Sequence, residues 1–303
     1  MISESKLSSM PMFLVAIAML AVISGPWAAG ETPRAADHLN NDQGFQSSPK
    51  LVAAAAPLPG EDTAAEAALL ESVNRSRVQA GVLPLRVEES LRQAARGHAG
   101  SMVANQRLEH QFPGEPSLLQ RIADVSLLPL DRAGENIANA TSPDDAHETL
   151  MRSPPHRENL LDARFNAVGI AAVWSQGRLY VVQDFAHTVP SYSPRQTSKL
   201  VGQAVGEARL SAGFDELAQF TSPRLDDAAC SLAKQDHPNA RLIAASFADR
   251  KTITYTQTRP EILPSEARRL LDDPSLRQFA VGSCYARNAA YPNGIYWVAI
   301  LLY

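Results

Sequence analysis

The chain has 303 residues, of which 45% are hydrophobic and 20% are charged, as is usual for a folded globular protein. Its formal net charge of −4 lacks the basic surplus of a nucleic-acid-binding protein and does not favour electrostatic docking on anionic membranes. The length allows one large domain or two ordinary ones.

The first thirty residues have the pattern of a secretory signal peptide. Residues 12–24, MFLVAIAMLAVIS, form an apolar run of signal-peptide length, and small residues follow at 28–30. An uncleaved N-terminal anchor is the alternative. We predict a signal peptide over residues 1–30 and an exported protein, periplasmic or secreted. Residues 31–60 lack apolar periodicity, which predicts a disordered linker.

A first helix is predicted to begin at residue 63. Thr63 and Glu66 have the spacing of a capping box, and Gly81 is a natural helix stop. The residues predicted to share the apolar face of this helix are Leu69, Leu70, Val73 and Val78.

Two more helices and a hairpin are expected before residue 190. The second helix runs from about residue 90 to residue 104. Its predicted apolar face contains Leu91, Ala94, Ala95, His98 and Met102. The third begins at Ser142-Pro143 and is expected to end at Pro154-Pro155, which would present His156 before the next strand. Residues 167–174 and 178–185 then read as an antiparallel β-hairpin joined by SQG.

The same pattern recurs after about residue 190. The matched segments are VNRSRVQAG with VGEARLSAG, LRQAA with LDDAA, and LLDARFNAVG with LLDDPSLRQFAVG. Chance similarity of Ala- and Leu-rich helices is the alternative. We interpret residues 61–190 and 191–303 as two copies of one α/β unit that form an intramolecular pseudo-dimer. The second copy is degenerate, since it lacks roughly twenty residues before its strands.

Six motifs of the first copy occur together in a fixed order. They are NRSR, LRQAARGHAGSM, LEH, AGENIA, SPPHRENLL and VGI…YVVQDF. In this order they resemble the CAP superfamily of cysteine-rich secretory, antigen 5 and pathogenesis-related proteins, whose domain is also called the SCP domain. The resemblance covers about Ala64 to Thr188 and is closest to short bacterial members. It implies an α/β fold, an α-β-α sandwich with an antiparallel sheet, followed here by a degenerate CAP-like α/β repeat.

The resemblance also implies a cavity lined by two histidines and two glutamates. The matching residues here are His110, Glu135 and His156, whereas Ser153 stands where the second glutamate would be. The missing carboxylate weakens any mechanism that requires both glutamates. In the second copy, alignment of the LLD segments places Glu266 at the position of His156 and Leu263 at that of Ser153, so that copy should lack the site.

These residues admit two chemical interpretations. Two neutral imidazoles and a carboxylate can hold a divalent cation such as zinc, with His110 and His156 as the candidate ligands. Ser153 or Glu158 could then orient the second nitrogen of an imidazole. The alternative is a hydrogen-bonded polar cluster that fixes the shape of the cavity. Glu135 is a candidate general base for metal-bound water, although H-E-x-x-H is absent; a Ser153–His156 nucleophile lacks a G-x-S-x-G elbow.

The remaining histidines receive structural interpretations. His98 is predicted to be a satisfied core imidazole and His147 to lie on a solvent-facing helix surface. His38, His187 and His237 have no metal-ligand spacing to a second histidine.

Cys230 and Cys284 are the only cysteines. In an exported chain such a pair suggests one disulfide, here between a helix and a strand that should pack together. Two buried free thiols are the alternative.

Three functions fit the sequence. The first is an exported CAP-domain protein that binds a small molecule, a lipid or an envelope component. The second is a metal-assisted hydrolase that uses His110, His156 and Glu135, and the third is a structural extracellular module. Whether the protein is an enzyme is left open by the sequence. Neither a nucleic-acid partner nor a membrane span after signal removal is expected.

Overall fold

The computed structural model describes residues 58–248 and 250–303. The signal peptide predicted at residues 1–30 and most of the predicted linker lie outside these residues. Residues 58–60 were assigned to the linker but contact the first sheet: the Trp174 N–H donates to the Gly60 carbonyl oxygen over 2.8 Å. Leu58 packs against a cluster of buried residues that includes Ala95 and Ala99.

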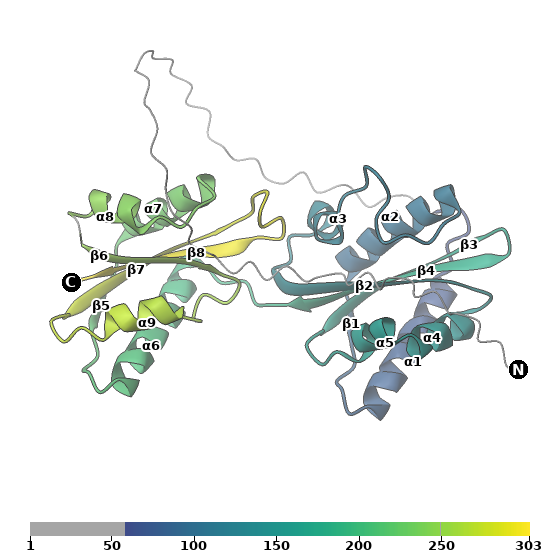
Figure 1. The fold of residues 1–303 in the computed structure, drawn as a ribbon, viewed down its shortest axis with the longest axis horizontal. Coiled ribbons are helices and arrows are strands. Elements are labelled where there is room, and N and C mark those ends of the chain that lie inside the picture. Colours follow the sequence, from purple (N-terminus) through teal and green to yellow (C-terminus); the bar gives the residue numbers. More distant parts are fainter. Residues whose placement is uncertain (1–57, 249) are drawn as a thin grey trace, which may run out of the picture. The chain divides into compact units, whose positions relative to one another are not determined.

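The first sheet has four strands in the order β1–β3–β4–β2 (Figure 1). Its strands are β1 (Arg86–Val87), β2 (Leu130–Ala140), β3 (Ala167–Ser175) and β4 (Arg178–Thr188). The hairpin of β3 and β4 is antiparallel as expected, and β2 continues the antiparallel sheet at one edge. The short strand β1 pairs in parallel with β3, which is the one departure from the predicted antiparallel sheet.

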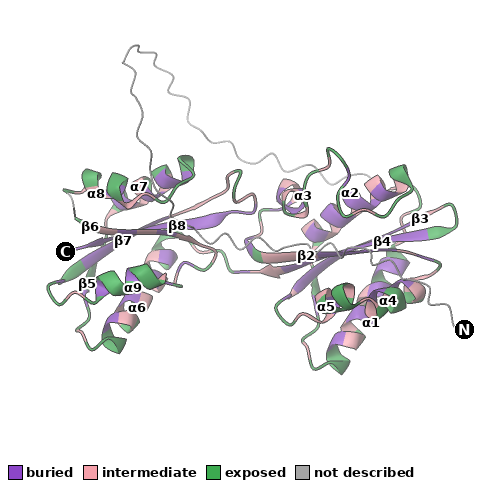
Figure 2. Ribbon diagram, in the orientation of Figure 1, coloured by how far each residue is buried: buried purple, intermediate pink, exposed green. Residues whose placement is uncertain are grey.

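Helices cover both faces of this sheet, which confirms the α-β-α sandwich (Figure 1). One face carries α1 (Thr63–Gln79), α4 (Pro143–Arg152) and α5 (Pro154–Leu161), and the other carries α2 (Glu89–Asn105) and α3 (Leu118–Val125). Both faces of the central strands are buried (Figure 2). On β4, Val181 and Phe185 belong to the core under α1, whereas Val182 and Ala186 pack on the α2 side, as strand alternation requires.

The start and face of α1 differ from the sequence prediction. Asp62, not Thr63, is the N-cap, and its Oδ1 accepts from the Ala65 N–H over 2.9 Å. Glu66 takes no part in a capping box and instead pairs with Arg96. Val78 is 60% exposed because Arg77, one position earlier, fills the buried side of this turn. Long-range packing therefore decided which residues of α1 face the core.

The Pro154-Pro155 pair follows one helix and begins the next. The helix α4 ends at Arg152, as predicted, but the two prolines occupy the first positions of α5, with Ser153 as its N-cap. Proline is tolerated there because the first N–H groups of a helix have no intrahelical acceptor. His156 consequently lies in the first turn of a helix rather than in a loop that leads to a strand.

Residues 191–303 form a second sheet of the same strand order, β5–β7–β8–β6 (Figure 1). Its strands are β5 (Ala218–Phe220), β6 (Lys251–Gln257), β7 (Gln278–Ala286) and β8 (Ile295–Leu302). One face packs against α6 (Pro194–Ser211) and α9 (Ser265–Leu271), and the other against α7 (Pro223–Lys234) and α8 (Ala240–Ser246). The edge strand β5 pairs in parallel with β7, just as β1 does with β3.

Two tertiary contacts recur in both sheets. The first contact is a glycine on which a helix lies. In the first sheet, Gly169 lies so close to α2 that an added Cβ would be 2.1 Å from backbone atoms of Leu91 and Arg92. In the second sheet, a Cβ on Gly282 would be 2.4 Å from the backbone of Leu225 in α7. Glycine is therefore required where each helix lies directly on its strand.

The second recurring contact is a buried arginine. Arg77 donates to the Leu160 and Asp162 carbonyl oxygens, and Arg209 donates to those of Leu271 and Asp273.

These arginine contacts shift the predicted alignment of residues 191–303 on residues 61–190 by one residue. Because Leu271, not Leu270, takes the place of Leu160, the counterpart of His156 is Ala267 rather than Glu266. The counterpart of Ser153 is then Pro264 rather than Leu263, and both Ser153 and Pro264 are helix N-caps. With either alignment, residues 191–303 have no histidine at this position.

Cys230 of α7 and Cys284 of β7 form a disulfide, as the sequence predicted. Their Cα atoms lie 5.0 Å apart, within the range that a disulfide can bridge. The bond joins the helix to the central part of the sheet and closes a chain segment with a sequence separation of 54.

Candidate functional site

Glu135 is the centre of a polar cluster on the edge strand β2. His110, from the loop after α2, places its Nδ1 2.8 Å from Glu135 Oε1. Arg121 of α3 donates to Glu135 Oε2. A carboxylate that is paired with a guanidinium is an acceptor, so the Nδ1 of His110 is its donor and carries the proton. The side chain of His110 is 49% exposed, while that of Glu135 is 5% exposed.

A second histidine lies beneath this pair. His98 of α2 is fully buried, with Nδ1 2.8 Å from Glu115 Oε1 and Nε2 2.9 Å from the Glu109 carbonyl oxygen. Its Nε2 is also 3.9 Å from Glu135 Oε2. Burial raises the pKa of Glu115, but hydrogen bonds from His98 and the Phe112 N–H outweigh it and leave that pKa below its ordinary value. His98 is thus the hydrogen-bonded core imidazole that the sequence predicted.

His156 reaches the same edge of the sheet from α5. Its backbone carbonyl accepts from Asn136 Nδ2 over 3.1 Å, which fixes the first turn of α5 to β2. Burial, followed by the nearby charge of His110, lowers the pKa of the His156 imidazole. The imidazole is therefore neutral at pH 7. Ser153 is the N-cap of α5 without a side-chain cap hydrogen bond, and Glu158 is exposed.

Asp184 of β4 is, like Arg121, a member of the cluster that the sequence did not reveal. It lies directly opposite Glu135 in the β2–β4 register and is fully buried. Neither of its carboxylate oxygens has a hydrogen-bond partner among the described residues. Burial, reinforced by the charge of Glu135 and opposed by that of Arg121, raises the pKa of Asp184 well above its ordinary range. A single acid within the apolar run YVVQDF was the signal that could have found it.

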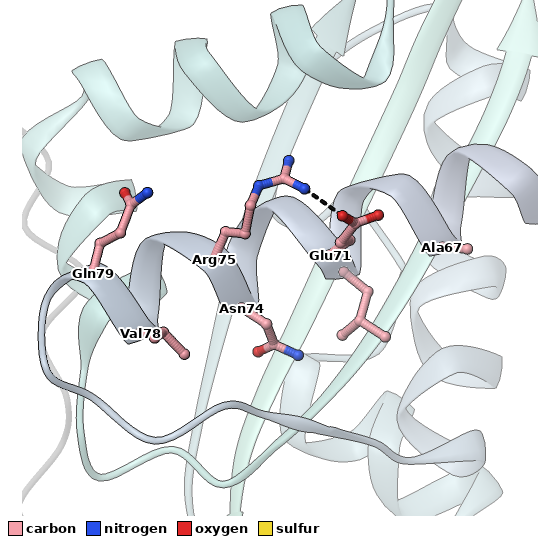
Figure 3. Close-up of a pocket in the computed structure, with 7 residues that line it drawn as sticks. Ala67, Glu71, Asn74, Arg75, Val78 and Gln79 are labelled. Carbon is pink, nitrogen blue, oxygen red and sulfur yellow. Dashed lines mark hydrogen bonds and ion pairs between the residues drawn. The ribbon is translucent and has the colours of Figure 1, made fainter.

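A hollow of about 480 Å³ lies in the loop that carries His110. The residues that line it are Arg107, Glu109, Gln111, Phe112, Pro113 and Gly114. A second hollow, of about 580 Å³, follows the outer side of α1. Figure 3 shows Ala67, Asn74 and Val78 along it, with the ion pair of Glu71 and Arg75 beside them. That hollow contains none of the residues predicted for the site.

The described residues fit a metal ion only in part. Both carboxylate oxygens of Glu135 are engaged, one by His110 and the other by Arg121. Within residues 58–248 and 250–303, no group of three or more His, Cys, Asp or Glu side chains is arranged to hold a metal. A cation here would depend on the imidazoles of His110 and His156, with Glu135 orienting His110 through Nδ1.

The other described histidines lie apart from this cluster. His147 does not face solvent as predicted: its Nε2 is 2.9 Å from Ser76 Oγ, between α4 and α1. His187 pairs with Asp131, with 2.6 Å between Nδ1 and Oδ1. His38 lies outside the described residues.

Comparison with known proteins identifies the class of domain. Residues 70–185 match the family model described as CAP, the cysteine-rich secretory protein family. The protein YkwD of Bacillus subtilis (strain 168) is 29% identical over 126 residues, which are 39% of this chain and 48% of YkwD. The matched region thus spans about half the length of that relative. Residues 70–185 of the chain thus match the CAP superfamily.

Solved structures resemble the chain over similar stretches. An extracellular SCP-domain protein from Bacillus anthracis str. Ames is 26% identical, with 41% of each chain covered and a TM-score of 0.37. A cysteine-rich secretory protein from Staphylococcus aureus subsp. aureus Mu50 is 16% identical, with 42% of this chain and 39% of that one covered and a TM-score of 0.35. In the part of this chain that the structure describes, no helix is long and apolar enough to cross a membrane.

Proposed function

We propose that this is an exported CAP-domain protein that binds a small polar molecule at His110, His156 and the neighbouring loop. The observation that carries the proposal is the half-exposed imidazole of His110, which is held by the buried pair of Glu135 and Arg121. Buried ion pairs contribute little net stability, whereas they can fix the geometry of an exposed group. A side chain fixed in this way loses little entropy when a ligand binds.

The polarity of the site defines the class of ligand. The ring of His110 is half-exposed, and Arg107 and Gln111 line the hollow beside it, where Arg107 pairs with Glu109 and Gln111 donates to the Glu115 carbonyl oxygen. These groups suit a molecule that carries hydroxyl, amide or carboxylate groups, such as a saccharide or short peptide of the cell envelope.

Binding is tested with soluble muropeptides and neutral oligosaccharides, followed by NMR of the imidazole resonances. We expect a ligand to perturb His110, and His110→Ala to weaken its binding at least about tenfold, as loss of an anchoring hydrogen bond does. His187→Ala is the matched control, because His187 is also a partly exposed imidazole that is paired with a carboxylate on the same sheet. If no probe perturbs His110, or if both variants bind like wild type, the proposal fails.

The metal-assisted hydrolase is the second candidate, and the proximity of His110 and His156 favours it. Zinc would have two imidazole ligands and would supply Lewis-acid chemistry there. Glu135 is committed to Arg121 and so is placed to orient His110 rather than to act as a base. Zinc should raise the melting temperature of the wild type, and His110→Ala and His156→Ala should each lose that shift. Equal responses of all three proteins exclude a metal at these residues.

We also propose that residues 191–303 are a degenerate CAP-like copy that serves as a structural module. The identical strand orders of the two sheets support this. Arg77 and Arg209 also make equivalent contacts, each within its own part of the chain, and so do Gly169 and Gly282. The disulfide in this copy supports export, since such bonds persist in oxidising compartments.

A further inference from the structure

We infer that Asn136 is the positioning residue for His156, because its side-chain amide holds the helix turn that carries this imidazole. Asn136 follows Glu135 on β2 and is fully buried. The inference rests on the proposed function, in which His110 and His156 belong to one site, and it names the residue that sets the place of the second histidine.

The two histidines of the site are held in different ways. The ring of His110 is hydrogen-bonded to Glu135 through Nδ1. In the described part of the chain, no group forms a hydrogen bond with the ring of His156, and it is the backbone carbonyl of His156 that contacts β2, through Asn136 Nδ2 at 3.1 Å. The place of the His156 ring therefore depends on how the first turn of α5 is held.

The amide of Asn136 is oriented by two other amides. Its Oδ1 accepts from Asn159 Nδ2 over 3.0 Å, and that nitrogen is also 3.3 Å from the Glu135 carbonyl oxygen. Its Nδ2 donates to Gln183 Oε1 over 3.4 Å as well as to the His156 carbonyl oxygen. The amide network of Asn136, Asn159 and Gln183 thus ties α5 to β2 at two residues three positions apart, which share one face of the helix.

The amide network has a cost that packing alone does not explain. Asn136 and Gln183 are fully buried, and Gln183 lies on the same face of β4 as Val181 and Phe185 of the apolar core under α1. The Nε2 of Gln183 has no hydrogen-bond partner among the described residues. A buried donor without a partner is destabilising, so apolar residues would serve helix packing better at these positions.

The second sheet has apolar or aromatic side chains at the corresponding strand positions. The two glycines on which α2 and α7 lie align β3 with β7. With the registers of the two sheets, this alignment places Val298 at the position of Gln183 and Tyr255 at that of Asn136. No amide side chain stands at either place.

The helix positions change together with the strand positions. The arginine contacts described above place Ala267 of α9 at the position of His156 and Leu270 at that of Asn159. Ala267 packs in an apolar cluster that includes Tyr255. A helix can therefore pack on this part of a sheet without the amides. In this chain the amide network accompanies the histidine, which supports a role in placing His156 rather than in packing.

NMR of the full-length protein without any ligand tests the inference. We expect the backbone order parameter of His156 to fall from about 0.85 in the wild type to below about 0.6 in Asn136→Leu, or its ring resonances to move, because the turn loses its tie to β2. Asn74→Leu is the matched control: both amide atoms of Asn74 bind the Leu85 backbone, at 3.1 and 2.8 Å, and join α1 to the segment before β1. It should lower the melting temperature and leave His156 unchanged. Wild-type order parameter and ring resonances of His156 in Asn136→Leu, or an equal change in Asn74→Leu, overturn the inference.

Asn159→Leu is a second variant that decides the matter if Asn136→Leu does not fold. Asn159 is only partly buried, and leucine stands at the corresponding position of α9. This variant removes the donor that orients Asn136, so the order parameter or ring resonances of His156 should change in the same way. Wild-type values of both in Asn159→Leu refute the positioning role. Because no ligand is present, failure of the proposed function in the binding experiments is distinguishable from failure of this inference.

Discussion

Arg77→Ala should destabilise the CAP domain more than the loss of a surface charge would. Arg77 is fully buried in α1 and has no carboxylate in hydrogen-bond contact among the described residues. Its guanidinium donates to four carbonyl oxygens, at 2.8 Å to Leu83, 2.9 Å to Leu160, 3.1 Å to Asp162 and 3.0 Å to Phe165. Two of these belong to the C-terminal end of α5, where carbonyl groups have no intrahelical partner.

The expected cost follows from these four acceptors. A buried carbonyl group that loses its donor costs about 1–3 kcal/mol, and water that enters the vacated space recovers part of this. With four acceptors and the lost packing of the side chain, we expect a loss of about 4 kcal/mol in the free energy of unfolding. The contact links α1 to the end of α5 and to the segment before β3, so the loss should affect the whole first domain.

The measurement is urea unfolding followed by circular dichroism. Arg75→Ala is the matched control, because Arg75 lies on the same helix, is 56% exposed and pairs only at the surface with Glu71 and Ser72. We expect that control to cost less than about 1 kcal/mol. If Arg77→Ala also costs less than about 1 kcal/mol, the buried carbonyl contacts do not carry the stability assigned to them.

Three further predictions follow from local geometry. Gly169→Ala should lower the free energy of unfolding by more than about 2 kcal/mol, because its Cβ would meet the α2 backbone at 2.1 Å. Gly97→Ala, in open space, should be neutral or stabilising, and equal melting temperatures of the two variants would contradict this. Replacing Cys230 and Cys284 together by Ser should destabilise the second copy by up to about 4 kcal/mol without changing the His110 resonances, and unchanged unfolding in urea would argue against the bond. The pKa of Asp184 is raised in the folded state, so its protonated carboxyl contributes its full stabilisation to the wild type below pH 3.8, the ordinary pKa. This stabilisation is lost as the pH rises toward the folded-state pKa. Asp184→Asn cannot ionise, so its stability relative to wild type should increase from pH 4 to pH 8, and a constant difference would disprove the raised pKa.

The sequence by itself determined the features that depend on nearby residues. The hairpin of residues 167–174 and 178–185 was predicted because its apolar runs are joined by a short turn that contains Gly177, which has a positive φ of 75°. Ser142-Pro143 was recognised as a helix start because capping involves only the first turn, and Ser142 does accept from the Asp145 N–H. The order of the motifs identified the family and thereby named His110, Glu135 and His156 as candidates.

Only the tertiary structure decided the partners of those candidates. Arg121 and Asp184 lie 14 and 49 positions from Glu135 in the sequence, and their contact with it depends on the docking of α3 and on the β2–β4 register. Helical periodicity likewise favoured Val78 for the core, but carbonyl oxygens near residues 160–165 stabilise the buried guanidinium of Arg77 instead. Local preferences act over a few residues, whereas burial and hydrogen-bond satisfaction are properties of the assembled chain, so these partners cannot be read from local sequence.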